Sequence, residues 1–215
     1  MKNKIYVGIL LAAVAVFCFL DAAHTGTSKK DIQVTDCYGR NVTVPANVKR
    51  IGCLYAFSGH VVAMLGRADD IVAVVRGLKR DKLLTGMYPS ILNASVPGSN
   101  DSLNVEELLS VNPDIVFIKD TIAGSKAETG MLNKFGIKYI VVYYESIEGQ
   151  MRAVSVIGRT IGREKEAEEY NRYYRKCIAR VKIIAASIPE NKKVRLYHSI
   201  LETLKTDGPA GIAAE

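Results

Sequence analysis

The amino-acid sequence predicts an α/β fold in which helices cover both faces of a parallel sheet. Short apolar runs alternate with stretches of helical spacing along the chain, which is the pattern of β-α-β units. One run, Ile115–Ile118, is apolar throughout and rich in β-branched residues, as expected for a strand buried on both faces. A chain of 215 residues with 48% hydrophobic content is large enough to bury such a core.

The first expected element is an antiparallel hairpin, because apolar positions in 32–35 and 42–44 flank the turn signal Tyr38-Gly39. Four apolar runs are then expected to form the sheet, and they cover residues 51–54, 71–75, 115–118 and 137–143. Helical spacing occurs between these runs, at residues 59–65, 105–109 and 125–135. Residues 76–103 contain several glycines and prolines and are expected to form a long connection.

The helix expected over residues 105–109 has clear start and stop signals. Three of its apolar residues recur at i, i+3 and i+4, and Asn104 stands where an N-cap is expected. Glu106 and Glu107 follow in the first turn, where acidic side chains interact favourably with the helix dipole. Pro113 cannot continue a helix, so the chain is expected to turn there into the next buried strand.

Two consecutive helices are expected within residues 146–188, with Gly162 interrupting the pattern. The second has apolar residues at alternating spacings of three and four, which predicts a long amphipathic helix over Glu164–Ser187. At 1.5 Å per residue this helix would be about 36 Å long. A coiled-coil segment is the alternative, although the pattern ends at Pro189 and is short for one. Residues 194–197 are expected to form one more strand.

The N-terminus indicates export from the cytoplasm. Two lysines precede the uncharged run Ile5–Leu20, so residues 1–22 are expected to be a signal peptide or, as the alternative, an uncleaved membrane anchor. The run is shorter than the roughly 20 residues that span a bilayer comfortably. Cys18 follows the bulky Phe17, which argues against a bacterial lipid-anchor site. Residues 23–30 are polar and are expected to form a flexible leader in the periplasm or at the outer cell surface.

The formal net charge of +7 does not by itself indicate a nucleic-acid partner. No zinc-finger spacing or RNA-binding aromatic motif accompanies the basic residues, so no nucleic-acid partner is expected. Cys37, Cys53 and Cys177 form no C-x-x-C motif and do not suggest a metal framework. Cys53 and Cys177 are expected to be small core residues, and a bridge between Cys37 and Cys53 is left open.

The common catalytic motifs are absent from the sequence. There is no G-x-S-x-G elbow, no phosphate-binding loop and no G-x-G-x-x-G fingerprint. Ser58 and His60 lie on one helical turn, where residues two apart do not face each other. The three histidines, His24, His60 and His198, are too few and too scattered to predict a zinc site. We therefore expect no catalysis and no resident cofactor.

The position of a ligand site follows from the expected sheet. In an open parallel sheet, ligands bind beyond the carboxyl ends of the strands. The residues that follow the expected strands, and are therefore the candidate ligand contacts, are Tyr55, Phe57, Ser58, Arg76, Lys79, Lys119, Asp120, Tyr144, His198 and Glu202. Aromatic rings, hydroxyls and cations dominate this set, which suits a large, partly apolar, anionic ligand. Arg76 in particular is expected to contact it, because the adjacent Gly77 permits a close backbone approach.

Three stretches of the sequence together carry a resemblance to a known family. "DIQVTDCYGRNVTVPANVKRIGCL" resembles the opening hairpin and first strand of ABC-transporter substrate-binding proteins of the iron–siderophore, haem and cobalamin class. "LNVEELLSVNPDIVFI" is similar to their Asn-x-Glu, leucine-rich and x-Pro-Asp-hydrophobic signature. "FGIKYIVV", followed by "IGRTIGREKEAEEYNRYY", resembles the passage into their single interdomain helix. No single motif identifies the family, but the three stretches occur in the expected order and the resemblance covers the chain from Asp31 onward.

The resemblance implies two Rossmann-like lobes joined by a rigid helix, with ligand held in the cleft and delivered to a membrane permease. On this basis residues 31–145 are expected to form the N-terminal lobe and residues 146–188 the helical connection. Residues 189–215 would be only the start of a C-terminal lobe, because the chain ends near that lobe's first strand. The chain is therefore expected to be a piece of a longer protein or the product of a truncated gene.

The resemblance also implies roles for particular residues. In the Asn-x-Glu signature the glutamate pairs with arginines of the permease, and here that position is Glu106. Relatives that bind bare zinc or manganese carry a histidine-rich region that is absent here, which favours a metal chelate as ligand. Arg76, Lys79 and Arg80 would suit the anionic groups of a ferric siderophore or haem, and cobalamin remains open. The alternatives are a bare-metal binder, a nucleotide-dependent Rossmann-like enzyme and a surface interaction module.

Overall fold

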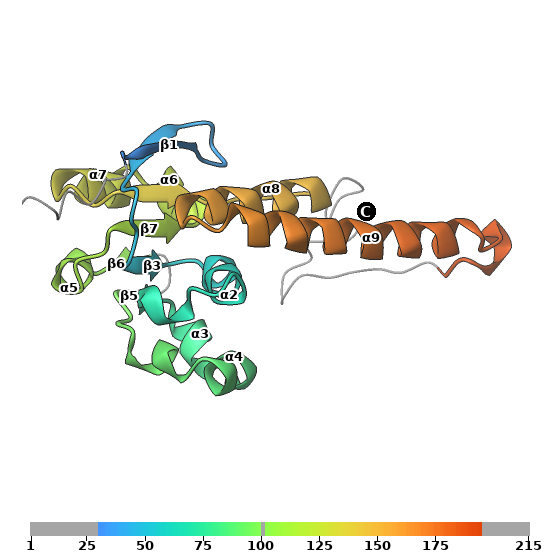
Figure 1. The fold of residues 1–215 in the computed structure, drawn as a ribbon, viewed down its shortest axis with the longest axis horizontal. Helices are drawn as coiled ribbons and strands as arrows, with labels where there is room; N and C mark the ends of the chain where they lie inside the picture. The colour runs from blue at the N-terminus through green and yellow to red at the C-terminus, as the bar shows by residue number, and fades with distance from the viewer. Residues whose placement is uncertain (1–29, 100–101, 195–215) are drawn as a thin grey trace, which may run out of the picture. The chain divides into compact units, whose positions relative to one another are not determined.

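The structure, a computed structural model, describes residues 30–99 and 102–194. A four-stranded parallel sheet forms the core of this part of the chain, in the order β4–β3–β7–β8. Two of its strands, β3 and β7, are labelled in Figure 1. The strands are β3 (Ile51–Cys53), β4 (Ile71–Val74), β7 (Ile115–Ile118) and β8 (Tyr139–Val141). All four lie within the runs expected from the sequence, although β8 is shorter than expected. The predicted α/β fold with a parallel sheet is confirmed.

Helices cover both faces of the sheet, as the alternation along β7 shows. Ile115 and Phe117 belong to one apolar cluster and Val116 and Ile118 to the other, and all four are fully buried. Burial of each such side chain contributes about 1.5–3 kcal/mol. The first cluster includes residues of α2 (Ala56–Met64) and α8 (Ile147–Thr160). The second includes residues of α5 (Val105–Ser110), α6 (Asp120–Gly124) and α7 (Lys126–Lys134).

The segment 76–103, expected as a long connection, is folded into short elements. They are α3 (Arg76–Arg80), α4 (Lys82–Met87), the 3₁₀ turn η2 (Pro89–Asn93) and the two-residue strands β5 (Gly98–Ser99) and β6 (Ser102–Leu103). Another 3₁₀ turn, η1 (Ala68–Asp70), precedes β4. Buried Leu78, Leu84 and Ile91 hold the segment against the core, and Asp81 caps α4 by accepting a hydrogen bond from the Leu84 amide. Each element is too short for its periodicity to be recognised.

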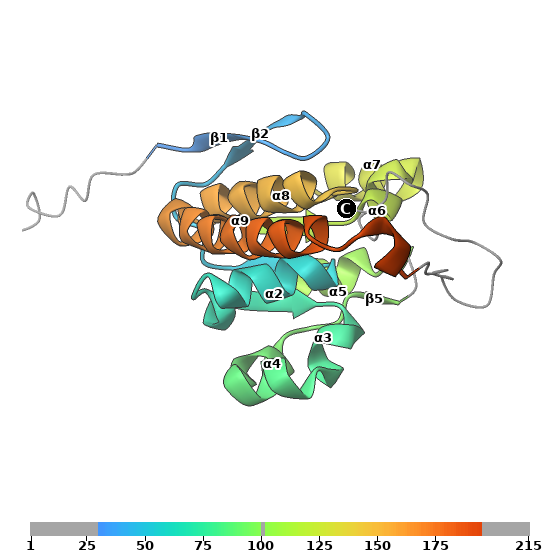
Figure 2. The ribbon, with the colours of Figure 1, turned by 90° about the vertical axis from the view of Figure 1, so that its right-hand side faces the viewer.

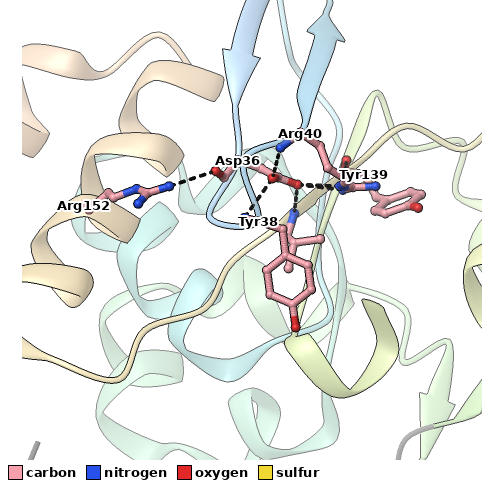
Figure 3. Close-up of polar contacts among 6 residues, drawn as sticks. Asp36, Tyr38, Arg40, Tyr139 and Arg152 are labelled. Carbon is pink, nitrogen blue, oxygen red and sulfur yellow. Dashed lines mark hydrogen bonds and ion pairs between the residues drawn. The ribbon is translucent and has the colours of Figure 1, made fainter. Parts of the chain in front are cut away.

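A hairpin of β1 (Ile32–Thr35) and β2 (Asn41–Val44) is joined to the sheet through Asp36 (Figure 3). The Asp36 side chain is fully buried and accepts two hydrogen bonds from the Arg40 guanidinium, at 2.9 and 2.7 Å. It also accepts one from each of the Tyr38, Arg40 and Val141 amides, and the last of these belongs to β8. Arg152 of α8 donates to the Asp36 carbonyl at 3.3 Å. One carboxylate therefore organises the turn and joins it to the sheet.

The expected helical pair is confirmed as α8 and α9 (Glu164–Ala186), which lie alongside each other in Figures 1 and 2. Gly162 separates them with a left-handed backbone, φ +68°. Gly158 permits their close contact, because a Cβ there would lie 2.5 Å from that of Ala167. Asn171, a buried polar residue that the apolar pattern did not mark, donates to the Met151 carbonyl and the Ser155 hydroxyl, both at 2.9 Å.

The second half of α9 keeps its apolar stripe exposed in the described part of the chain. Val181 and Ile184 are each 58% exposed, whereas Ala167 in the first half is buried against α8. A final 3₁₀ turn, η3 (Glu190–Lys192), follows α9. The strand expected at 194–197 lies almost entirely outside the described residues, as do the expected leader and the N-terminal segment before residue 30.

Two further observations bear on the sequence expectations. Cys37, Cys53 and Cys177 are all free thiols, so the bridge left open between Cys37 and Cys53 is not formed. Cys53 is buried as expected, whereas Cys177 is only half-buried on α9. None of the helices in the ranges 30–99 and 102–194 combines the length and the apolar character needed to cross a membrane.

Candidate functional site

A pocket of about 320 Å³ lies at the edge of the sheet where β3, β4 and β7 end. Each of these strands is followed by a helix, and the three N-cap residues, Tyr55, Val75 and Lys119, all line the pocket. The pocket therefore lies at the carboxyl ends of the strands, which is the edge where the sequence placed the ligand site. The loops expected at Arg76–Arg80 and Lys119–Thr121 are instead the first turns of α3 and α6.

Three cations line this pocket. Arg76 and Arg80 lie four residues apart on α3, so they share one face of that helix, and Lys119 precedes α6. Neither arginine has an ion-pair or hydrogen-bond partner among the described residues, and both are exposed. The Lys119 ammonium lies 3.9 Å from an Asp120 carboxylate oxygen, which partly offsets its charge. No aspartate or glutamate is among the described residues that line the pocket, so its field favours an anion.

Aromatic rings border the pocket at Tyr55. The Tyr55 ring centroid lies 5.9 Å from that of Phe57, and the Phe57 centroid lies 4.8 Å from that of Tyr144. Burial raises the pKa of the Tyr55 phenol, and a hydrogen bond with Tyr144 raises it further, so the phenol stays neutral at physiological pH. The rings of Tyr55, Phe57 and Tyr144, all partly exposed, therefore offer flat apolar surface beside the cationic pocket.

Only some of the residues expected at the ligand site line or border the pocket. Tyr55, Arg76 and Lys119 line the pocket, and Phe57 and Tyr144 lie beside it through ring contacts. The other described candidates, Ser58, Lys79 and Asp120, do not line it. His198 and Glu202 lie outside the described residues.

Local contacts explain where Ser58 and Asp120 lie. Ser58 is fully buried, donates to the Tyr55 carbonyl at 2.7 Å and shares a hydrogen bond with the Cys53 thiol. Its hydroxyl is therefore part of the core side of α2. One Asp120 carboxylate oxygen is buried without a hydrogen-bond partner among the described residues, but the Lys119 ammonium stands beside it.

The pocket also contains residues outside the ten candidate contacts. Arg80, which was expected with Arg76 and Lys79 to suit an anionic ligand, lines the pocket, and its i, i+4 spacing places it on the same face of α3 as Arg76. Thr121, which follows Lys119 and Asp120 after β7, lines it as well. Ser102 lines the pocket from a two-residue strand that has no detectable pattern.

The paired glutamates of α5 differ in their surroundings. Asn104 caps α5 as expected, accepting a hydrogen bond from the Glu107 amide at 3.1 Å. The Glu107 carboxylate accepts hydrogen bonds from the Ser95 hydroxyl and, at 3.3 Å, from the Val96 amide. Glu106 is exposed and has no hydrogen-bond or ion-pair partner among the described residues. Glu107 therefore has a structural role, and only Glu106 is free to meet another molecule.

A bound metal ion would need a different set of side chains. Within residues 30–99 and 102–194, no three histidine, cysteine, aspartate or glutamate side chains come together to form a metal site. The described lining of the pocket thus offers cations, a tyrosine ring and hydroxyls rather than metal ligands.

Comparisons with known proteins agree with this fold. No protein-family model matches the chain. Its sequence is 28% identical over 110 residues to the molybdate-binding protein MolA of Haemophilus influenzae, covering 50% of this chain and 31% of that protein. It is 24% identical over 180 residues to YvrC of Bacillus subtilis, an uncharacterized ABC transporter substrate-binding lipoprotein, covering 79% of this chain and 55% of that protein. This chain therefore spans only part of the length of either relative.

Solved structures give the same result. The structure of MolA bound to molybdate matches with a TM-score of 0.67 at 20% identity, over 77% of this chain and 57% of that one. A periplasmic solute-binding protein from Veillonella parvula matches with a TM-score of 0.66 at 23% identity, over 74% of this chain and 50% of that one. Haem-binding and vitamin B12-binding proteins share the fold at lower TM-scores, 0.55 and 0.53. The resemblance to solute-binding proteins of ABC transporters is confirmed at the level of fold.

Proposed function

We propose that this chain forms the ligand-capturing N-terminal lobe, residues 31–145, and the helical connection, residues 146–188, of an exported ABC-importer substrate-binding protein. Residues 189–215 would begin the C-terminal lobe. The exposed apolar stripe on the second half of α9 supports this division, because such a surface requires a partner that residues 30–99 and 102–194 do not supply. The named relatives are binding proteins rather than enzymes, so we propose no catalysis and no cofactor.

The ligand is an anion with an apolar part, and the observation that carries this conclusion is the lining of the pocket. Arg76, Arg80 and Lys119 meet there without a lining carboxylate, and the two arginines have no internal partner among the described residues. Guanidinium groups bind carboxylates and catecholates through paired, charge-assisted hydrogen bonds. The rings from Tyr55 to Tyr144 would cover the apolar part. A ferric siderophore, haem or a corrinoid offers both features, so a metal chelate remains our first candidate.

A small oxyanion is the second candidate. MolA, which is 28% identical to this chain over 110 residues, is named as molybdate-binding, and the same three cations would hold such an anion without the rings. A bare metal cation fits poorly, because the described lining of the pocket carries positive charge and lacks carboxylates.

The deciding experiment uses the complete gene product purified from its own host. Bound material is identified by mass spectrometry and visible absorption, and the emptied protein is titrated with ferric enterobactin, haemin, cyanocobalamin and sodium molybdate. We expect a chelate to be bound and one of the first three probes to bind tightly. Tight binding of molybdate alone would select the oxyanion, and a co-purifying nucleotide would overturn the proposed function.

Delivery to the membrane would use Glu106. In the family signature that this chain resembles, the equivalent glutamate pairs with arginines of the permease. The exposure of Glu106, and its lack of a partner among the described residues, support this role. The same role is not proposed for Glu107, because its carboxylate holds the Ser95–Val96 segment. Such a pairing would speed the encounter with the permease and weaken as salt is added.

A further inference from the structure

A second, more open groove of about 620 Å³ lies between α5 and α7, and Arg76 lines both this groove and the pocket. Its lining includes Val105 of α5 and two large apolar side chains, Met131 of α7 and Phe135 at the end of that helix. Met131 and Phe135 of this lining are 41% and 43% exposed. The apolar surface is therefore available to a partner on the same side of the fold as Glu106, which also lines the groove.

Two of the three carboxylates in the groove hold its walls in place. Glu107 ties the first turn of α5 to Ser95 and Val96, and Glu128 of α7 accepts a hydrogen bond from the Leu103 amide at 3.3 Å. Glu106 is the carboxylate left without a partner among the described residues. The groove is thus a preformed apolar surface with one free negative charge at its edge.

We infer that this groove receives a segment of the membrane permease in which an arginine or lysine stands beside a large apolar side chain. The inference rests on the proposed function and extends it from one glutamate to a surface. The basic group would pair with Glu106, and the apolar side chain would cover Met131 and Phe135. Charge complementarity supports this occupant, because the described lining carries three glutamates and one arginine in a chain of net charge +7.

The test is site-specific photo-crosslinking of the complete protein in its native host. A photoreactive amino acid replaces Met131 or Phe135, and a control replaces Leu92, which is 52% exposed on η2 and does not line the groove. We expect crosslinks to the membrane subunit of an ABC permease from positions 131 and 135 but not from 92. The crosslinked peptide should contain a basic residue next to a large apolar one. A crosslink to a second copy of the chain, or equal crosslinking from position 92, would overturn the inference.

Substitutions provide a second readout. Phe135→Ser and Glu106→Gln should each weaken binding to the purified permease by about tenfold, the range of a moderate interface residue, while Leu92→Ser should not. Chelate binding should be unchanged in all three variants. If chelate is bound and imported normally by Phe135→Ser, the groove inference fails and the proposed function stands. If the wild-type protein binds no probe and supports no uptake, the proposed function itself fails.

Discussion

Removing Arg76 or Arg80 separately measures what each guanidinium contributes to ligand binding. Both side chains line the pocket, both are exposed and neither has a partner among the described residues. Replacement of either arginine by alanine should therefore remove a contact with the ligand without breaking an ion pair or hydrogen bond to the described part of the chain. A hydrogen bond to a charged group contributes about 1.5–3 kcal/mol. The dissociation constant for an anionic chelate should rise about tenfold to a hundredfold for each variant.

The stability of these variants should hardly change. A surface substitution away from caps, cores and ion pairs alters the free energy of unfolding by less than about 0.5 kcal/mol. For a domain of this size that corresponds to a shift of about 2 °C or less in Tm. A weakened ligand affinity together with an unchanged Tm would show that the arginines act on the ligand rather than on the fold.

The matched control is Lys79→Ala, which removes the same charge from the same helix. Lys79 does not line the pocket, so its loss should leave the affinity within about twofold of wild type. Titration calorimetry of the complete protein with ferric enterobactin and haemin, at low and moderate salt, measures all three variants. If Lys79→Ala weakened binding as much as Arg76→Ala, only the net charge of α3 would matter. If neither arginine variant changed affinity, the pocket would not be the anion site.

Three further outcomes follow from the contacts described. Asp36→Ala should destabilise the protein by about 3 kcal/mol, because the amides and the guanidinium that donate to the buried carboxylate would lose their acceptor. The Tm should therefore fall by about 6–12 °C. A fall of less than about 2 °C would contradict the role of Asp36 in joining the hairpin to the sheet. Glu106→Arg in the complete protein should abolish uptake while ligand binding stays intact. Glu148→Arg should not affect uptake, although Glu148 is also an exposed glutamate in the first turn of a helix, α8. Normal uptake by the Glu106→Arg variant would contradict the docking role. Burial raises the pKa of the Cys53 thiol to about 12. Because the unfolded chain loses this proton at lower pH than the folded protein, the free energy of unfolding should fall between about pH 9 and 12. Iodoacetamide at pH 8 should label the half-buried Cys177 but not the buried Cys53. Rapid labelling of Cys53 in the folded protein would contradict its burial.

Glu107 is unsuitable as the control position for Glu106, although the two residues are adjacent in one helical turn. The structure shows that Glu107 holds Ser95 and Val96, so its replacement would also disturb the wall of the groove. Glu148 has no such contact among the described residues and therefore tests charge alone.

Local sequence signals predicted the elements whose cause is itself local. The buried strand Ile115–Ile118 was predicted because four consecutive apolar residues must be covered on both faces. The start of α5 was predicted because the Asn104 side chain caps an amide three residues away. The long helix α9 was predicted because its apolar spacing persists over many turns. The edge of the sheet that holds the pocket followed in turn from strand direction alone.

Tertiary structure decided which side chain at that edge does what. Arg80 rather than Lys79 lines the pocket because α3 is helical, and that short helix forms only with Leu78 buried against the core. Ser58 turns inward because its hydroxyl donates to the Tyr55 carbonyl and shares a hydrogen bond with the buried Cys53 thiol. Glu106 and Glu107 look alike in the sequence, and they differ because only Glu107 lies within reach of the segment 95–96. These distinctions depend on partners brought together by folding, and so no local pattern in the sequence encodes them.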